Sequence, residues 1–221
     1  MNTIKSNRQM NEWSGHFGWQ YTDRNLMTLE EMEKLWEGNY GFTRSEINKL
    51  FLSRMDASSK ILEVGSNIGN QLACLQKGGF KKLYGIDLQF YAVDLIRKRT
   101  KGIQVVQGSA FELPFKDRRF DIVFTSGLLI HIAPDNINAV LDEVYRCSAR
   151  FIWGAEYYGA TYIEVPYRGK EGLMWKGDFS RMFLDRFKDL RSVKEVSMKY
   201  LQNENVDVMY LLEKDDEREE K

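Results

Sequence analysis

The sequence contains few of the residues that hold disulfide-rich domains or structural metal centres together. Only two of the 221 residues are cysteines, Cys74 and Cys147, and they stand in neither CxxC nor Cys/His metal spacing. Disulfide frameworks and zinc sites need clustered or regularly spaced ligands. We therefore expect two reduced thiols and no metal site.

Net charge and long apolar runs are also lacking. The sequence balances 32 basic residues against 32 acidic ones, so no overall field attracts phosphate backbones, and nucleic acid is not an expected partner. No uninterrupted apolar run approaches the roughly 20 residues needed to span a bilayer, and the first residues include no apolar stretch of the signal-peptide kind. These absences favour a cytoplasmic protein with no membrane partner.

The residues that are present indicate one substantial core, because 43% of them are hydrophobic. From about Ser58, apolar runs of the strand type alternate with helical patterns, which is typical of a parallel sheet. Five strands are expected at 60–65, 82–87, 102–108, 120–127 and 150–158, and the helices at 70–77, 91–99 and 136–145. Two later strand candidates, 192–200 and 206–214, follow an irregular loop at 159–177 and a helix at 179–187.

This pattern predicts an α/β fold with a single Rossmann-like domain, in which helices flank a central, mostly parallel seven-stranded sheet. We divide the chain into a helical cap or lid at 1–57, the main domain at 58–213 and a charged tail at 214–221. The segment from Leu29 to Met55 supplies the helical core of the cap.

A glycine-containing loop follows the first expected strand. Glu63 ends that strand, Gly65 and Gly69 enclose the turn, and Asn67 stands where a dinucleotide-binding loop would have its second glycine. Asp87 ends the second strand, where a carboxylate can accept hydrogen bonds from ribose hydroxyls. The simpler alternative is a pair of ordinary turn glycines with Asp87 as a helix cap.

The stretch from Lys60 to Glu156 resembles the class I S-adenosylmethionine-dependent methyltransferases, whose glycine-rich first motif is matched by residues 63–69. The resemblance implies S-adenosyl-L-methionine as cofactor and Asp87 as the ribose ligand. It implies an adenine site at Ser109, Ala110 and Phe111 and a methionine site at 125–128 that includes Ser126. Leu88 or Gln89, just after the ribose acid, could cover the other face of the adenine. Phe111 is alternatively a plain core aromatic.

Two residues near strand ends are candidates for catalysis. His131 follows the fourth expected strand and could act as a general base, and Glu156 ends the fifth and could orient or deprotonate an acceptor. Both have structural alternatives, a packed histidine and a loop cap. After the fourth strand the sequence has no Asn/Asp-Pro-Pro-aromatic tetrad of the kind that holds a flipped base, which is a second argument against nucleic acid.

The N-terminal segment supports a narrower resemblance, to the methylases associated with pseudaminic-acid biosynthesis. It rests on Gly15, Phe17, Gly18, Tyr21, Arg24 and Asn25. It implies a sugar or nonulosonic-acid-related acceptor and glycan modification. As a lid, this segment could bring Tyr21 and Arg24 to the methionine carboxylate. The alternative is a leader packed on the sheet with Trp13, Phe17 and Trp19 as core.

The sequence thus predicts a methyltransferase acting on O or N of a small or carbohydrate-like acceptor. A non-catalytic nucleoside-binding protein and a nicotinamide-dependent Rossmann oxidoreductase stay as alternatives. A homodimer is compatible with the sequence.

Overall fold

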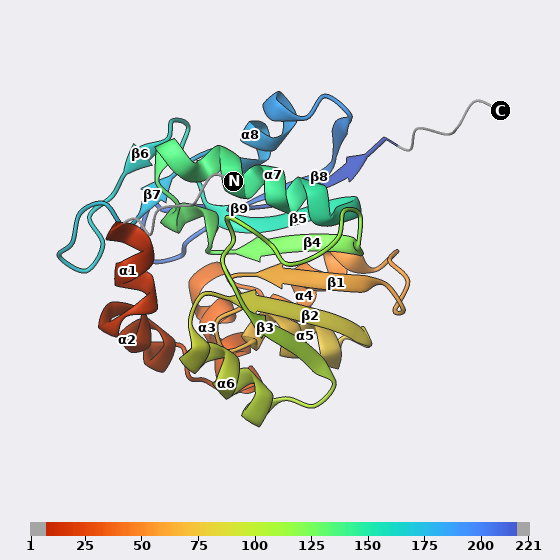
Figure 1. Cartoon of the computed structure of the whole chain (residues 1–221), viewed down its shortest axis with the longest axis horizontal. Coiled ribbons are helices and arrows are strands. Elements are labelled where there is room, and N and C mark those ends of the chain that lie inside the picture. The colour runs from red at the N-terminus through yellow and green to blue at the C-terminus, as the bar shows by residue number, and fades with distance from the viewer. Residues whose placement is uncertain (1–7, 216–221) are drawn as a thin grey trace.

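The apolar runs of the sequence form one seven-stranded sheet in the computed structural model, which describes residues 8–215. The strand order is β3-β2-β1-β4-β5-β9-β8, and only β9 and β8 run antiparallel to their neighbours. This confirms the predicted Rossmann-like α/β fold (Figure 1). The strands are β1 (Lys60–Val64), β2 (Lys82–Asp87), β3 (Ile103–Gln107), β4 (Phe120–Ser126), β5 (Ser148–Tyr157), β8 (Leu190–Lys199) and β9 (Val206–Lys214).

The direction of winding reverses at the centre of the sheet. Strand β1 pairs with β2 on one side and with β4 on the other, so the chain runs outward in both directions from this point. In open α/β sheets such a switch point leaves a crevice at the carboxyl ends of the strands. The fold therefore places its binding site beyond the ends of β1, β2 and β4.

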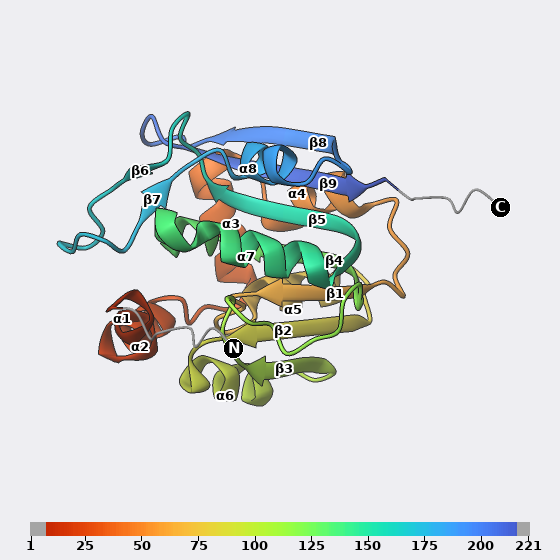
Figure 2. The same cartoon turned by 45° about the horizontal axis from the view of Figure 1, so that its top comes forward.

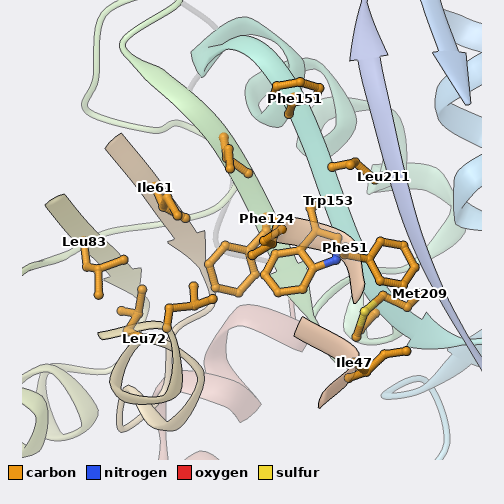
Figure 3. Close-up of a cluster of buried hydrophobic side chains, with 14 of the residues drawn as sticks. Ile47, Phe51, Ile61, Leu72, Leu83, Phe124, Phe151, Trp153, Met209 and Leu211 are labelled. Atoms are coloured by element: carbon orange, nitrogen blue, oxygen red, sulfur yellow. The ribbon is translucent and has the colours of Figure 1, made fainter. Parts of the chain in front are cut away.

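Alternation along each strand divides the core into two layers. Ile61 faces the layer that contains α4 (Arg44–Leu52), α5 (Asn70–Lys77) and α6 (Phe90–Arg99), whereas Leu62 faces α7 (Pro134–Cys147) and α8 (Phe179–Arg186). Figure 3 shows the first layer, with Trp153 and Phe124 at its centre. Burying both faces of the sheet explains why its strands are runs of apolar residues.

The helical core of the cap consists of two helices. Helix α3 (Leu29–Tyr40) ends at Gly41, whose φ of 81° is left-handed, and α4 begins three residues later. Both helices start with a capping box, formed by Thr28 with Glu31 and by Thr43 with Glu46. Each box satisfies two amides at the start of its helix, those of the threonine and the glutamate.

Two further helices, α1 (Arg8–Ser14) and α2 (His16–Arg24), cover the carboxyl ends of the central strands (Figures 1 and 2). The loop at 159–177 contains a small hairpin of β6 (Ile163–Glu164) and β7 (Trp175–Lys176). Residues 1–7 of the expected cap and 216–221 of the expected tail lie outside the described residues. Within the described chain, we find no helix long and apolar enough to cross a membrane.

Candidate functional site

A cavity of about 270 Å³ lies at the predicted crevice, between the ends of β1, β2 and β4 and the covering helices α1 and α2. The expected cofactor-site residues that line it are Tyr21, Glu63, Gly65, Asn67, Asp87, Leu88, Ser109, Ala110, Phe111 and Ser126. His131 lines it as well. Arg24, Gly69 and Glu156 are not among the lining residues.

The glycine loop follows its strand as the sequence indicates. Gly65 has a φ of 75°, and a Cβ atom there would meet Leu128 Cδ1 at 2.8 Å. Only glycine therefore combines this left-handed backbone with close packing on the loop after β4. Gly69, with a φ of 76°, caps α5 and packs on Ile96, so it shapes the turn from outside the cavity.

Asp87 is fixed by the loop that it faces. Its Oδ2 accepts a hydrogen bond from the Asn67 amide at 2.8 Å, and its Oδ1 accepts one from the Gln89 amide at 2.8 Å. Burial raises the pKa of this carboxyl, and the two amide hydrogen bonds oppose that shift. Each carboxylate oxygen has lone pairs beyond these bonds, so the group can accept two hydroxyl donors from a ligand.

Glu63 lies deeper, at the floor of the cavity, where only 2% of it is exposed. Burial raises its pKa well above the usual range, and the nearby positive charge of Arg44 opposes the shift. Arg44 is itself fully buried, with its guanidinium 4.5 Å from the centroid of the Trp36 ring. Sequence reasoning missed Arg44, because a charged residue in the first turn of a helix is normally exposed.

The expected adenine side is a short turn after β3. Ser109 Oγ accepts a hydrogen bond from the Phe111 amide at 3.2 Å, which orders the turn. Phe111 is half-buried: its ring packs against the core layer under α7 and it also lines the cavity. This position is compatible with both of its expected roles, a core aromatic and an adenine-site residue.

His131 ends the 3₁₀ turn η1 (Leu129–His131) and is only 8% exposed. Its Nδ1 lies 2.7 Å from the carbonyl oxygen of Leu173. Because a carbonyl can only accept, Nδ1 carries the hydrogen and Nε2 has the lone pair. Burial lowers the pKa of His131 to about 4, which the Leu173 contact partly offsets, so the imidazole is neutral at pH 7.

Glu156 lies behind that turn and not in the cavity. Its Oε1 accepts a hydrogen bond from the Leu128 amide at 3.2 Å and its Oε2 accepts one from the Ile130 amide at 3.4 Å. Burial raises its pKa to about 7. Glu156 therefore has the structural role expected as the alternative, that of a loop cap. Its carboxyl holds the segment that carries His131, and the residue does not line the cavity.

Arg24 likewise does not line the cavity. It occupies the last turn of α2, and its guanidinium carbon is 6.0 Å from the centroid of the Tyr21 ring. Tyr21 itself faces the cavity and contacts the ring of His131 edge-on, with centroids 6.1 Å apart. Of the two residues expected to meet the methionine carboxylate, the structure brings only Tyr21 to the site.

The covering helices are attached to both sides of the crevice. Gln9 donates to the His131 carbonyl and accepts from the Ala133 amide, while Gln89 donates to the Trp13 carbonyl and accepts from the Thr22 hydroxyl. Neither glutamine side chain was expected to join the cap to the site. Polar residues beside a motif carry no periodic signal that reveals such a partner.

Comparison with known proteins agrees with this geometry. Residues 62–150 match the methyltransferase domain family. Over this stretch the chain is similar to methyltransferase domains. The match spans the glycine loop, Asp87 and the loop after β4, and S-adenosylmethionine is the cofactor that such domains and their solved structures support.

Individual relatives are distant. A phosphoethanolamine N-methyltransferase of Plasmodium falciparum (isolate 3D7) is 23% identical over 181 residues, which cover 80% of this chain and 64% of that protein. The chain therefore spans less than two thirds of the length of this relative.

Two solved structures share the fold. A protein of Pyrococcus horikoshii OT3 has a TM-score of 0.67 at 15% identity, with 90% of this chain and 100% of that one covered. A Burkholderia thailandensis N1-methyltransferase, solved with 1,6-didemethyltoxoflavin and S-adenosylhomocysteine, has a TM-score of 0.66 at 14% identity, with 94% and 87% covered. The pseudaminic-acid-associated group is not among these findings.

Proposed function

We propose that this protein transfers a methyl group from S-adenosylmethionine to an oxygen or nitrogen of a small acceptor. The observation that carries the proposal is the cavity at the switch point of the sheet, which Gly65 and Asp87 both line. Asp87 would bind the ribose, Phe111 and Leu88 would enclose the adenine, and Tyr21 would meet the methionine part.

The cavity also fits the charged end of the donor. Glu63 Oε2, Asn67 Oδ1 and Gln71 Oε1 are buried without a hydrogen-bond partner in the described chain, and all three residues line the cavity. Buried oxygens of this kind are costly unless a ligand supplies donors. The ammonium group of the methionine part supplies three N–H donors, which suits this floor.

The residues of the chain contribute mainly by positioning the donor and the acceptor and by excluding water. Methyl transfer from a sulfonium is an in-line displacement on an activated donor, so alignment supplies much of the rate. Helices α1 and α2 cover the space, and the Glu156 carboxyl holds the loop that carries His131. Among the described side chains that line the cavity, His131 is the one most similar to a general base, because its neutral Nε2 carries a lone pair that can accept a proton.

For the acceptor, the N-terminal resemblance supports a sugar or nonulosonic-acid-related compound, and the small-molecule methyltransferase relatives support a small polar molecule. We propose to divide the chain into a cap at 1–57, a main domain at 58–213 and a tail at 214–221. We also propose a cytoplasmic location. A homodimer is part of the proposal.

The proposal is tested by label transfer. Purified protein is incubated with methyl-labelled S-adenosylmethionine and a small-molecule extract of its source cells, and the products are separated by mass. We expect one labelled class of small molecule, formed in equal amount with S-adenosylhomocysteine and formed more slowly by Asp87→Ala at subsaturating donor. Donor binding without any labelled product would instead favour the non-catalytic nucleoside-binding alternative.

A further inference from the structure

The described side chains that line the cavity include carboxyl groups but no permanently positive group. Among the described residues, none of those that line the cavity is a lysine or an arginine. Its ionisable side chains are Glu63 and Asp87, which are neutral or negative at any pH, together with Tyr21 and His131. Because burial disfavours protonation of His131, nothing in this lining offers a positive charge to a ligand at neutral pH.

One wall of the cavity is aromatic. The rings of Trp13 and His131 lie with centroids 4.3 Å apart, and Tyr21 meets Trp13 edge-on at 5.3 Å. All three residues line the cavity. Aromatic faces attract cations through their quadrupole, and the attraction grows where water is excluded.

The same wall contains no strong base. Burial raises the pKa of Tyr21, so its phenol stays protonated at neutral pH, and the imidazole of His131, with its pKa lowered to about 4, is a weak acceptor of protons. Deprotonating an alcohol needs a better base, whereas an unprotonated amine attacks a sulfonium methyl without one. The wall therefore suits nitrogen chemistry better than oxygen chemistry.

We propose that the acceptor presents an amine nitrogen to the Trp13, Tyr21 and His131 wall, and that carboxylate or phosphate groups of an acceptor stay outside the cavity. This inference rests on the proposed function. The nitrogen lone pair forms the new bond to the methyl carbon as the carbon–sulfur bond breaks, and the bonding pair stays on sulfur. Positive charge passes to the nitrogen beside the aromatic wall, and the product ammonium releases a proton to solvent. The amino group of an amino sugar meets this requirement.

The experiment compares three probes of similar size and different charge: tetramethylammonium, tert-butanol and pivalate. Binding to the S-adenosylhomocysteine-loaded protein is followed by the relaxation of the probe methyl protons in NMR, a readout that does not depend on tryptophan. We expect tetramethylammonium to bind at least about tenfold more tightly than either other probe, which is about 1.4 kcal/mol and within the range of cation–π contacts.

Trp13→Leu should remove this preference, and Tyr21→Leu is the second wall variant if the first does not fold. Trp19→Leu is the matched control, because Trp19 lies on the adjacent helix but is 50% exposed and does not line the cavity. Equal or tighter binding of pivalate, no binding of tetramethylammonium, or an unchanged preference in the folded wall variants would overturn the inference.

Titrating the protein with S-adenosylhomocysteine first distinguishes failure of the proposed function from failure of this inference. If it does not bind, the donor assignment fails, and the probes are then compared on the unloaded protein, where the same preference still tests the wall. If it binds and the cation preference is absent, only the inference fails.

Discussion

At the scale of single residues, Asp87 is the side chain on which donor binding should depend most. Its two oxygens are held by the amides of Asn67 and Gln89, so the carboxylate is oriented before a ligand arrives. Replacing Asp87 with Ala should weaken binding of S-adenosylhomocysteine by about 1 to 3 kcal/mol, the range for losing a charged hydrogen-bond partner.

Isothermal titration measures this change. Asp94→Ala is the control, since Asp94 lies on α6 and pairs only with the exposed Lys98 in the described contacts. Unchanged affinity in Asp87→Ala, or an equal loss in both variants, would contradict the ribose assignment.

His131 should make the stability of the fold depend on pH. Its folded pKa of about 4 lies below its ordinary value of 6.5, so the unfolded chain binds the proton more readily. The free energy of unfolding should therefore fall as the pH decreases from 6.5 towards 4, by up to about 3 kcal/mol from this group.

Denaturant unfolding of wild type and His131→Asn across this pH range isolates the effect, because an asparagine amide can still donate to the Leu173 carbonyl. The difference between the two proteins should change with pH, whereas His16→Asn, at an exposed position, should follow wild type. A difference that stays constant with pH would show that His131 is not held neutral by burial.

At the scale of elements, the attachment of α1 and α2 depends on close backbone approach at Gly18. A Cβ atom there would lie 1.8 Å from Gln89 Nε2 and 1.9 Å from the Trp13 carbonyl oxygen. Gly18→Ala should therefore displace the covering helices, increase amide exchange in residues 9–25 and weaken donor binding.

Gly38→Ala is the matched control. Gly38 lies inside α3 with open space around its Cβ position, so alanine should stabilise the protein by about 0.5 to 1 kcal/mol through helix propensity. Faster exchange at 9–25 in Gly38→Ala, or none in Gly18→Ala, would contradict the proposed docking of the cap.

The sequence was most informative where burial dictates pattern. The parallel strands and the helix at 70–77 were predicted closely, because strands covered on both faces are apolar runs between turn residues. The sequence identified 29–55 only as a helical core and did not divide it at Gly41, since a single glycine inside an amphipathic pattern does not show whether it interrupts or tolerates a helix.

Side-chain direction was the part of the site that the sequence could not determine. Glu156 and Arg24 have the chemistry expected of binding residues, but one turns to the amides of Leu128 and Ile130 and the other lies over the ring of Tyr21. Both outcomes depend on neighbours distant in the chain or on the rotation of one helix. The glycine loop and Asp87 were predictable because their roles depend on the backbone.

At the scale of the whole molecule, the sheet and the covering helices bound the cavity, and the loop at 159–177 packs against α1 and the turn that carries His131. Tyr167 of that loop packs on His131 with centroids 5.3 Å apart, and Lys170 pairs with Glu12 of α1 at 2.5 Å. The cap therefore contacts the loops after β2, β4 and β5 together. Its arrangement suits a donor that is enclosed before an acceptor is methylated.

The central claim is that this cavity binds S-adenosylmethionine, and parallel isothermal titration of the whole chain with S-adenosylmethionine, S-adenosylhomocysteine and NAD tests it most directly. We predict saturable binding of both adenosyl compounds, no binding of NAD, and loss of binding in a folded variant with a β-branched residue at Gly65. Binding of NAD alone, or of none of the three, would contradict the account.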